Sequence, residues 1–410
     1  MKARCPGFTF HNTSLRSPHP GHVGHTKPDI CCFTADNLKV VKRSDLETHA
    51  ELAHAELFIQ VLPEPALDFF SDPPLEASPD ELDAHEFLFV SEDESLVRRV
   101  DGLFGQHIAF ATELFSRQHR VFLFTIAIFG SHARFFRWDR AGCIVSSAFD
   151  IREEPELLCD FLWRFSQSSD AGRGHDSTVG TARPDEELMF KNAITEHVRV
   201  QLGVEDGKLN SAVSEHYQPG RVSAMHVLSH GTVANISNIR RFIVSRPVVS
   251  PLSLSGRGTR GYWAVDPSDG SVVFLKDTWR TPVDELEGHI LQRLVSDGVC
   301  NIPEVVTYGD VPDGFPAEAH LLSGEFSTPK NLIITSDNLQ TEEELQITGT
   351  DEFTSTEWVR RVNGEAIRLT PLTHHRLVLK TVGYGLQRFR GTEELLHATY
   401  DAFAGEPDAL

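Results

Sequence analysis

The chain has 410 residues, of which 40% are hydrophobic and 24% charged. This composition is ordinary for globular proteins and excludes a wholly disordered or fibrous chain. With 38 Lys and Arg against 59 Asp and Glu, the formal net charge is −21. So acidic a chain is repelled on average by phosphate backbones and anionic membranes, and we expect neither nucleic acid nor a membrane among its partners. Protein partners and the oligomeric state stay open.

Cysteine content and apolar run length bear on the cellular compartment. Six cysteines are too few for a disulfide scaffold and favour a reducing compartment, so we expect the cytoplasm or the nucleus. The longest strongly apolar run, residues 121–129, has about half of the roughly 20 residues that a membrane-spanning helix needs. It is typical of a buried strand.

The charge of the chain changes abruptly near residue 43. Residues 1–43 carry seven Lys or Arg and two Asp, whereas residues 44–97 carry fifteen Asp or Glu and no Lys or Arg. We therefore expect a disordered basic tail over residues 1–43, followed by an α/β module over residues 44–170. The expected elements of this module are a strand at 57–61, a helix at 100–115, a strand at 121–129, a hairpin with its turn at 139–142 and a helix at 154–165.

A polar stretch after this module opens a linker and helical segment over residues 171–240, with a helix from Pro184 and a strand at 222–228. Residues 241–410 then form a second module with an antiparallel sheet, so that the fold class is α+β. Its expected elements are strands at 241–245, 262–265 and 271–275, a helix from Pro282, a strand at 302–307, a polar insertion at about 310–370, a strand at 376–382 and a helix at 392–404.

Three glycines of the second module, Gly256, Gly258 and Gly261, have the spacing GxGxxG. A loop without side chains lets backbone N–H groups approach phosphates closely, although a flexible hairpin tip has the same sequence. A dinucleotide-binding fold would place a helix after the loop, whereas here a strand, a turn and a second strand follow. This order is typical of protein kinases.

The second strand ends in Lys276, 20 residues after Gly256, where a lysine could reach phosphates beneath the loop. The apolar run before it indicates a largely buried strand, and a charge leaving such a strand needs a partner. In the following helix Glu287 shares the apolar face with Leu291, whereas Glu285 lies on the solvated face. We prefer a Lys276–Glu287 pair over the alternative of two solvated surface charges.

Seven stretches of the chain resemble successive blocks of the fungal-type protein kinases, from about residue 45 to the end. They are HAELFIQVLPEPALDFF, SRQHRVFLFTIAIFGSHARFFRWDRAGCIVSSAFD, LCDFLWRFS, RGHDSTV, VVFLKDTWR, NIPEVVTYGDV and HHRLVLKTVGYGLQRFRGTEELLHATYDAFAG. The resemblance implies an N-terminal α/β region joined to a kinase domain that binds ATP.

By this resemblance the three glycines form the loop over the phosphates, Lys276 holds the α- and β-phosphates, and Glu287 orients Lys276. Residues 377–382 would lie beside the adenine. Residues 393–404 would be the first large helix of the C-terminal lobe, so that residues 241–410 hold an N-lobe with one αC-type helix and little of the C-lobe.

The family continues with a His-Arg-Asp catalytic loop, a downstream Asn and an Asp-containing metal motif. In this sequence His375-Arg376 is followed by Leu377, the last asparagine is Asn363, and no Asp-Phe-Gly string exists. Without these groups a hydroxyl proton has no acceptor and Mg²⁺ has no ligands. We expect a truncated, pseudokinase-like member of the serine/threonine-type superfamily that contacts ATP weakly, holds no Mg²⁺ and has no catalytic residues.

The α/β module invites comparison with the PD-(D/E)xK restriction-endonuclease fold. In that fold a carboxylate and a lysine two residues apart hold a metal and its water, but here the places are taken by Gln60 and Leu62. We expect no nuclease chemistry. Asp139 is interpreted as a turn former, and His175 with Asp176 as part of an unburied loop.

A His/Cys-rich group near the N-terminus matches no zinc spacing, so we expect a solvated tail and no metal site. Its members are Cys5, His11, His19, His22, His25, Cys31 and Cys32. The alternative function for the whole chain is a non-enzymatic interaction or regulatory scaffold, in which acidic residues 44–97 attract basic partners.

Overall fold

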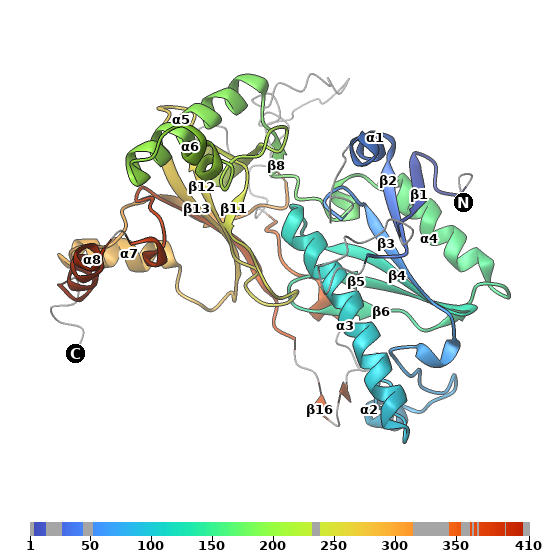
Figure 1. Cartoon of the computed structure of the whole chain (residues 1–410). Helices are drawn as coiled ribbons and strands as arrows, with labels where there is room; N and C mark the ends of the chain where they lie inside the picture. The colour runs from blue at the N-terminus through green and yellow to red at the C-terminus, as the bar shows by residue number, and fades with distance from the viewer. Residues whose placement is uncertain are drawn as a thin grey trace, which may run out of the picture. The chain divides into compact units, whose positions relative to one another are not determined.

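The computed structural model describes residues 4–13, 27–43, 52–231, 238–314, 344–353, 361–362, 365–366, 369–389 and 391–404. The chain forms two compact units, neither of which is continuous in sequence (Figure 1). The first unit takes residues 1–176, 251–258 and 348–372, and the second takes residues 177–250, 259–347 and 373–410. Each unit holds one large β-sheet together with helices, which confirms the α+β class.

The sheet of the first unit has the order β1-β2-β3-β4-β5-β6, with β7 paired to β5. Its strands are Phe8–Asn12 (β1), Ile30–Thr34 (β2), Leu57–Leu62 (β3), Leu123–Phe129 (β4), His132–Trp138 (β5), Cys143–Val145 (β6) and Phe149–Asp150 (β7). β3 and β4 are parallel, which requires a crossover connection, and the long helix α3 (Glu94–Arg117) lies in that connection. The other pairs are antiparallel.

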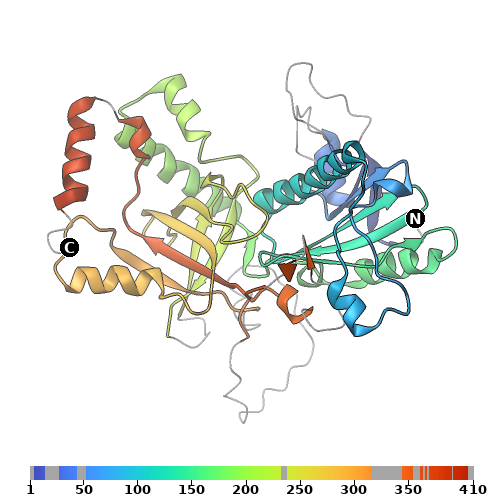
Figure 2. The same cartoon turned by 90° about the horizontal axis from the view of Figure 1, so that it is seen from below.

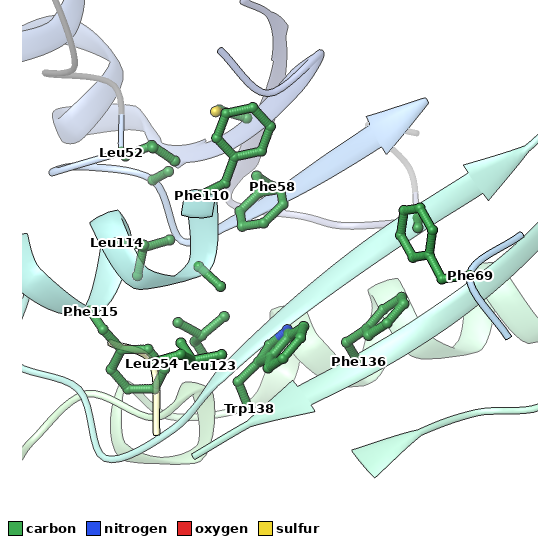
Figure 3. Close-up of a cluster of buried hydrophobic side chains, with 14 of the residues drawn as sticks. Leu52, Phe58, Phe69, Phe110, Leu114, Phe115, Leu123, Phe136, Trp138 and Leu254 are labelled. Carbon is green, nitrogen blue, oxygen red and sulfur yellow. The ribbon is translucent and has the colours of Figure 1, made fainter. Parts of the chain in front are cut away.

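Helix α3 begins six residues before the predicted start, because the Asp93 carboxylate accepts hydrogen bonds from the backbone N–H groups of Ser95 and Leu96. Figures 1 and 2 show it lying against the first sheet. Its buried face packs on aromatic residues of the sheet in the core drawn in Figure 3. That core includes Phe58, Phe69, Phe110, Leu114, Phe115, Leu123, Phe136 and Trp138.

The opposite face of this sheet is covered by α4 (Pro155–Gln167), whose Leu162 and Phe165 are buried against Leu57 and Ile126. The prediction of this helix is confirmed. Leu157 in the first turn of this helix is 42% exposed. The described residues of this unit also contain helices α1 (Ala35–Arg43) and α2 (Pro79–Ala84) and the short strand pair β15 (Arg361–Val362) and β16 (Glu365–Ala366).

The N-terminal segment differs from the prediction of a disordered basic tail. Strands β1 and β2 extend the sheet beside β3, and Cys5, Cys31 and Cys32 are fully buried. The prediction is wrong for these residues, because pairing with an existing sheet edge buries apolar side chains that a segment rich in Pro, Gly and His would not bury alone. His19, His22 and His25 lie outside the described residues.

The sheet of the second unit has the order β14-β17-β13-β12-β10-β9-β8, with β11 paired to β12, and all its pairs are antiparallel. Its strands are Val179–Thr181 (β8), Ser223–Leu228 (β9), Ile239–Val244 (β10), Pro247–Val249 (β11), Arg260–Val265 (β12), Val272–Arg280 (β13), Val305–Asp310 (β14) and Thr373–Leu379 (β17). The sheet curls until the segment after β9 meets β14, where the His230 N–H donates to the Tyr308 carbonyl at 2.7 Å.

One face of this curled sheet carries a continuous apolar cluster that includes Met225, Phe242, Tyr262, Leu275 and Val378. The helices pack on the other face. They are α5 (Pro184–Leu202), α6 (Asp206–Val213) and α7 (Glu287–Ser296), and α8 (Thr392–Ala404) follows the last strand at the predicted residues.

The observed units differ from the predicted division of the chain. Residues 171–240 are more than a linker, because they supply β8, α5, α6 and β9 to the second unit. Most of the predicted insertion at 310–370 lies outside the described residues. In the part of the chain that the structure describes, no helix combines the length and the apolar character needed to cross a membrane.

Candidate functional site

Lys276 lies in the middle of β13, where its neighbours decide its environment. β13 pairs with β12 on one side and with β17 on the other, so that Lys276 is opposite both Gly261 and Leu377. Strand residues alternate between the two faces, and Lys276 shares its face with Phe274 and Trp263. We call this side of the sheet the Lys276 face. The lysine side chain is 24% exposed.

Glu287 is the first residue of α7, five residues later than the predicted helix start at Pro282. A carboxylate in the first turn is stabilised by the helix dipole. Leu286 and Leu291 pack on Tyr308 and Leu377, which fixes α7 against β14 and β17 on the Lys276 face. Gly288 permits this close approach, since a Cβ there would lie 2.3 Å from the Tyr308 ring.

The Lys276 Nζ donates to Glu287 Oε2 at 2.5 Å. The predicted pair is therefore formed, while Glu285, predicted to be solvated, forms an exposed ion pair with Arg293. The Glu287 side chain is 45% exposed, so the pair is open to a ligand in solution. A strand lysine held by a helix carboxylate presents a positioned ammonium group to an anion such as phosphate.

The three glycines fall on either side of the boundary between the two units. Gly261 lies in β12 opposite Lys276, where a Cβ would come within 2.7 Å of the Phe274 ring. Gly256 and Gly258 belong to the first unit, where both adopt positive φ values of 90° and 49°.

The loop that carries Gly256 and Gly258 is held by the first unit itself. The Gly256 N–H donates to the Arg140 carbonyl at 2.8 Å, and a Cβ on Gly258 would come within 2.6 Å of the Arg140 guanidinium. Leu254 of the same loop is buried beside Phe115 and Leu123 (Figure 3). These contacts and the positive φ values account for glycine at positions 256 and 258 without a bound nucleotide, because only glycine adopts positive φ values freely.

Sequence reasoning missed a buried charge cluster on the other face of the second sheet. Asp277 accepts hydrogen bonds from His374 Nε2 at 2.6 Å, Arg376 Nε at 3.0 Å and Arg260 Nη2 at 2.8 Å. Burial alone would raise the pKa of Asp277, but His374 and the two guanidinium groups hold it well below its ordinary value. The pair His375-Arg376 thus belongs to a structural strand, with Arg376 fully buried.

A second cluster lies at the ends of β13, β14 and β17. The Asp310 carboxylate accepts from Arg280 Nε at 2.9 Å and from Arg280 Nη2 at 2.6 Å, and it contacts His375 Nδ1 at 2.8 Å. Burial opposes ionisation, but these hydrogen bonds and charges outweigh it and lower the pKa of Asp310 to about 2. This arrangement ties the strand ends together.

The first unit contains a similar buried cluster around Glu56. Its carboxylate meets Arg120 and Arg173 and contacts His175 Nε2 at 2.9 Å. Although burial acts to raise the pKa of Glu56, the His175 hydrogen bond and the two arginines lower it to about 2. The interpretation of His175 and Asp176 as an unburied loop is wrong, since Asp176 is 4% exposed.

Gln60, the residue at the compared nuclease position, lies in a neutral buried network. Its Oε1 contacts His107 Nδ1 at 2.9 Å, and His107 Nε2 contacts the Thr125 hydroxyl at 2.8 Å. Burial lowers the pKa of His107 to about 3, so the ring is neutral at pH 7. Asp139 forms its predicted turn by accepting from the Ala141 and Gly142 N–H groups.

Among the described residues, no group of three or more His, Cys, Asp or Glu side chains is placed to hold a metal ion. Leu62, the second compared nuclease position, ends β3 as a buried apolar residue.

Comparison with known families matches residues 104–407 to the family described as fungal protein kinase. The chain belongs to the fungal protein kinase family. The matched region contains the Lys276–Glu287 pair and extends over parts of both units. The chain matches no curated protein and no solved structure.

Proposed function

We propose that the second unit corresponds to the N-lobe of a protein kinase and contacts the phosphates of ATP through Lys276. The observation that carries the proposal is the contact of 2.5 Å between Lys276 Nζ on β13 and Glu287 Oε2 at the start of α7. In protein kinases a strand lysine paired with a glutamate of the αC helix binds the α- and β-phosphates of ATP. Membership of the fungal protein kinase family supports this reading.

We further propose that these 410 residues act as a pseudokinase, which binds ATP weakly and transfers no phosphate. Transfer needs a carboxylate that accepts the hydroxyl proton, and an Asn and an Asp that hold Mg²⁺. The sequence given has no His-Arg-Asp or Asp-Phe-Gly string that would supply them. ATP bound at Lys276 would then act as a ligand and not as a phosphate donor.

The low cysteine content supports a location in the cytoplasm or nucleus. The acidic stretch at 44–97 supports basic proteins as partners. We also propose that the first unit shares the architecture of the PD-(D/E)xK fold but not its nuclease chemistry.

The test is a thermal-shift titration with Mg-ATP on the wild type, Lys276→Met and a matched control, Lys380→Met. Lys380 follows β17 and pairs with Glu304 at 2.9 Å, but its side chain is 65% exposed. At ten times the dissociation constant, ATP should stabilise the wild type by about 1.4 kcal/mol, or roughly 3–6 °C. Lys380→Met should keep this shift and Lys276→Met should lose it.

Equal thermal shifts in the wild type and Lys276→Met would remove Lys276 from the site.

Incubation of the same proteins with γ-labelled ATP and a protein acceptor tests the proposed lack of phosphate transfer. We expect no labelled product. Label that appears with the wild type and disappears with Lys276→Met would contradict the proposed lack of transfer.

A further inference from the structure

Two cysteines of the first unit, Cys5 and Cys32, lie in contact. Both side chains are 0% exposed. They belong to one buried cluster with Leu57 of β3 and Leu162 of α4. In the sheet register Cys32 lies on β2 opposite Phe10 of β1 and Leu57 of β3. The Cys32 thiol donates a hydrogen bond to the Cys5 sulfur, so the two sulfurs are close enough to react with each other.

Cys31 precedes Cys32 in the sequence but faces the opposite side of the sheet, because successive strand residues point to opposite faces. It belongs to the hydrophobic cluster that α3 covers. The Thr13 hydroxyl donates to its sulfur at 3.7 Å. Cys31 is therefore kept apart from Cys5, and it provides an adjacent thiol against which the specificity of the Cys5–Cys32 pair can be tested.

The chain that covers Cys5 is a short turn before β1. In this turn Arg4, Pro6 and Gly7 are exposed, although the Cys5 side chain is buried. The backbone hydrogen bond from the Phe8 N–H to the Cys5 carbonyl is long, at 3.3 Å. β1 is an edge strand of its sheet. An exposed turn beside an edge strand opens at a lower free-energy cost than a central strand, so a small oxidant reaches Cys5 without unfolding of the sheet.

A fixed positive charge lies beside this pair. The Arg173 guanidinium lies 5.0 Å from the centre of the Phe8 ring and 5.9 Å from that of Phe165, and both rings pack in the same cluster. The hydrogen bond from Cys32 and the charge of Arg173 lower the pKa of Cys5 against the effect of burial. The hydrogen bond to Cys5 and burial raise the pKa of Cys32. Cys5 is thus the thiol that ionises and reacts first, and Cys32 is the neighbour that resolves its oxidation product.

We propose that Cys5 and Cys32 are an oxidation site, at which hydrogen peroxide converts two thiols into a disulfide. The Cys5 thiolate attacks one peroxide oxygen, the O–O bond breaks, and the departing hydroxide takes a proton from the solvent to give water and a Cys5 sulfenic acid. The Cys32 sulfur then attacks the Cys5 sulfur, the S–O bond breaks, and the departing hydroxide leaves with the Cys32 proton as a second water. The two thiols lose two electrons and the peroxide gains them. The disulfide fastens the turn before β1 covalently to β2.

The test treats the fully reduced chain with hydrogen peroxide under native conditions and identifies linked peptides by mass spectrometry without reduction. A Cys5–Cys32 link should form in the wild type and in Cys31→Ser, and dithiothreitol should reverse it. Cys32→Ser should form no link, and its Cys5 should carry a sulfenic acid that dimedone traps. A wild type in which exposed Cys300 is oxidised but Cys5 is not, or in which Cys5 links to Cys31, would overturn the inference.

Thermal melting distinguishes a disulfide within the native fold from one formed in misfolded chains. The proteins for this measurement carry Cys300→Ser, so that links between chains through this exposed thiol do not contribute. The Cys5–Cys32 disulfide should raise the melting temperature of the first unit by roughly 5–10 °C, because it constrains the unfolded chain. Dithiothreitol should abolish the rise, and peroxide-treated Cys32→Ser should not show it. An unchanged or lower melting temperature of the linked chain would contradict the proposal.

Discussion

Replacing Asp277 by alanine should destabilise the second unit more than any exposed charge change. Asp277 is 2% exposed and neutralises a cluster in which Arg376 is fully buried and Arg260 is 4% exposed. The variant leaves two buried guanidinium groups without their shared carboxylate. Removing one partner of a buried ion pair costs about 3–5 kcal/mol, because the remaining charge stays desolvated.

The contacts of Arg376 place the expected loss at the lower end of this range. Its Nη1 also donates to the Thr178 hydroxyl and the His226 carbonyl, both at 2.7 Å, and these bonds survive the substitution. We therefore expect a loss of about 3 kcal/mol in the free energy of unfolding. In a unit of this size that loss lowers the melting temperature by roughly 6–12 °C.

Urea unfolding followed by tryptophan fluorescence measures this loss, because Trp279 stacks on His374 of the cluster at 4.6 Å between centroids. Asp269→Ala is the control, since Asp269 is an exposed turn residue that accepts one backbone hydrogen bond from Ser271. The control should lose less than about 1 kcal/mol. Equal losses in the two variants would refute the buried-charge argument.

Two further predictions concern acid stability and strand packing. Glu56 and Asp310 have pKa values of about 2 in the folded chain, below the ordinary values of 4.5 and 3.8. Their ionised carboxylates therefore stabilise the fold above those ordinary pKa values, and this stabilisation is lost as the pH falls towards 2. The urea midpoint should drop over this pH range, and Asp310→Asn should make the drop smaller. A midpoint that rises on acidification would contradict the lowered pKa values of Glu56 and Asp310. Gly309→Ala should cost about 1–3 kcal/mol, because a Cβ on Gly309 would lie 2.1 Å from the Leu228 carbonyl, whereas Gly180→Ala, with open space around it, should be near neutral. Circular-dichroism melting compares the two, and equal melting temperatures would show that β9 and β14 are not in close contact.

Elements with a strong local pattern could be predicted from the sequence. The apolar periodicity of residues 100–115 indicates α3, and the run before Lys276 indicates β13. The Lys276–Glu287 pair follows from the same reasoning, since a lysine leaving a buried strand needs a counter-charge and Glu287 shares the apolar face of its helix.

Features that depend on distant contacts could not be predicted in this way. The loop with Gly256 and Gly258 belongs to the first unit because Arg140 bonds to Leu254, 114 residues away. Arg376 is buried because Asp277 lies opposite, 99 residues earlier in the chain. Helix α6 has a short sequence with only Leu209, Ala212 and Val213 buried, which gives a weak periodic signal.

The most direct test of the central claim measures the chemical protection of Lys276 by a bound phosphate chain. The full chain is treated with an amine-reactive acyl ester with and without saturating Mg-ATP, and acylation at each lysine is quantified by peptide mass spectrometry. If Lys276 contacts the phosphates, its acylation rate should fall several-fold while that of Lys380, paired with Glu304 on the surface, stays unchanged. An acylation rate at Lys276 that is the same with and without ATP would contradict the account.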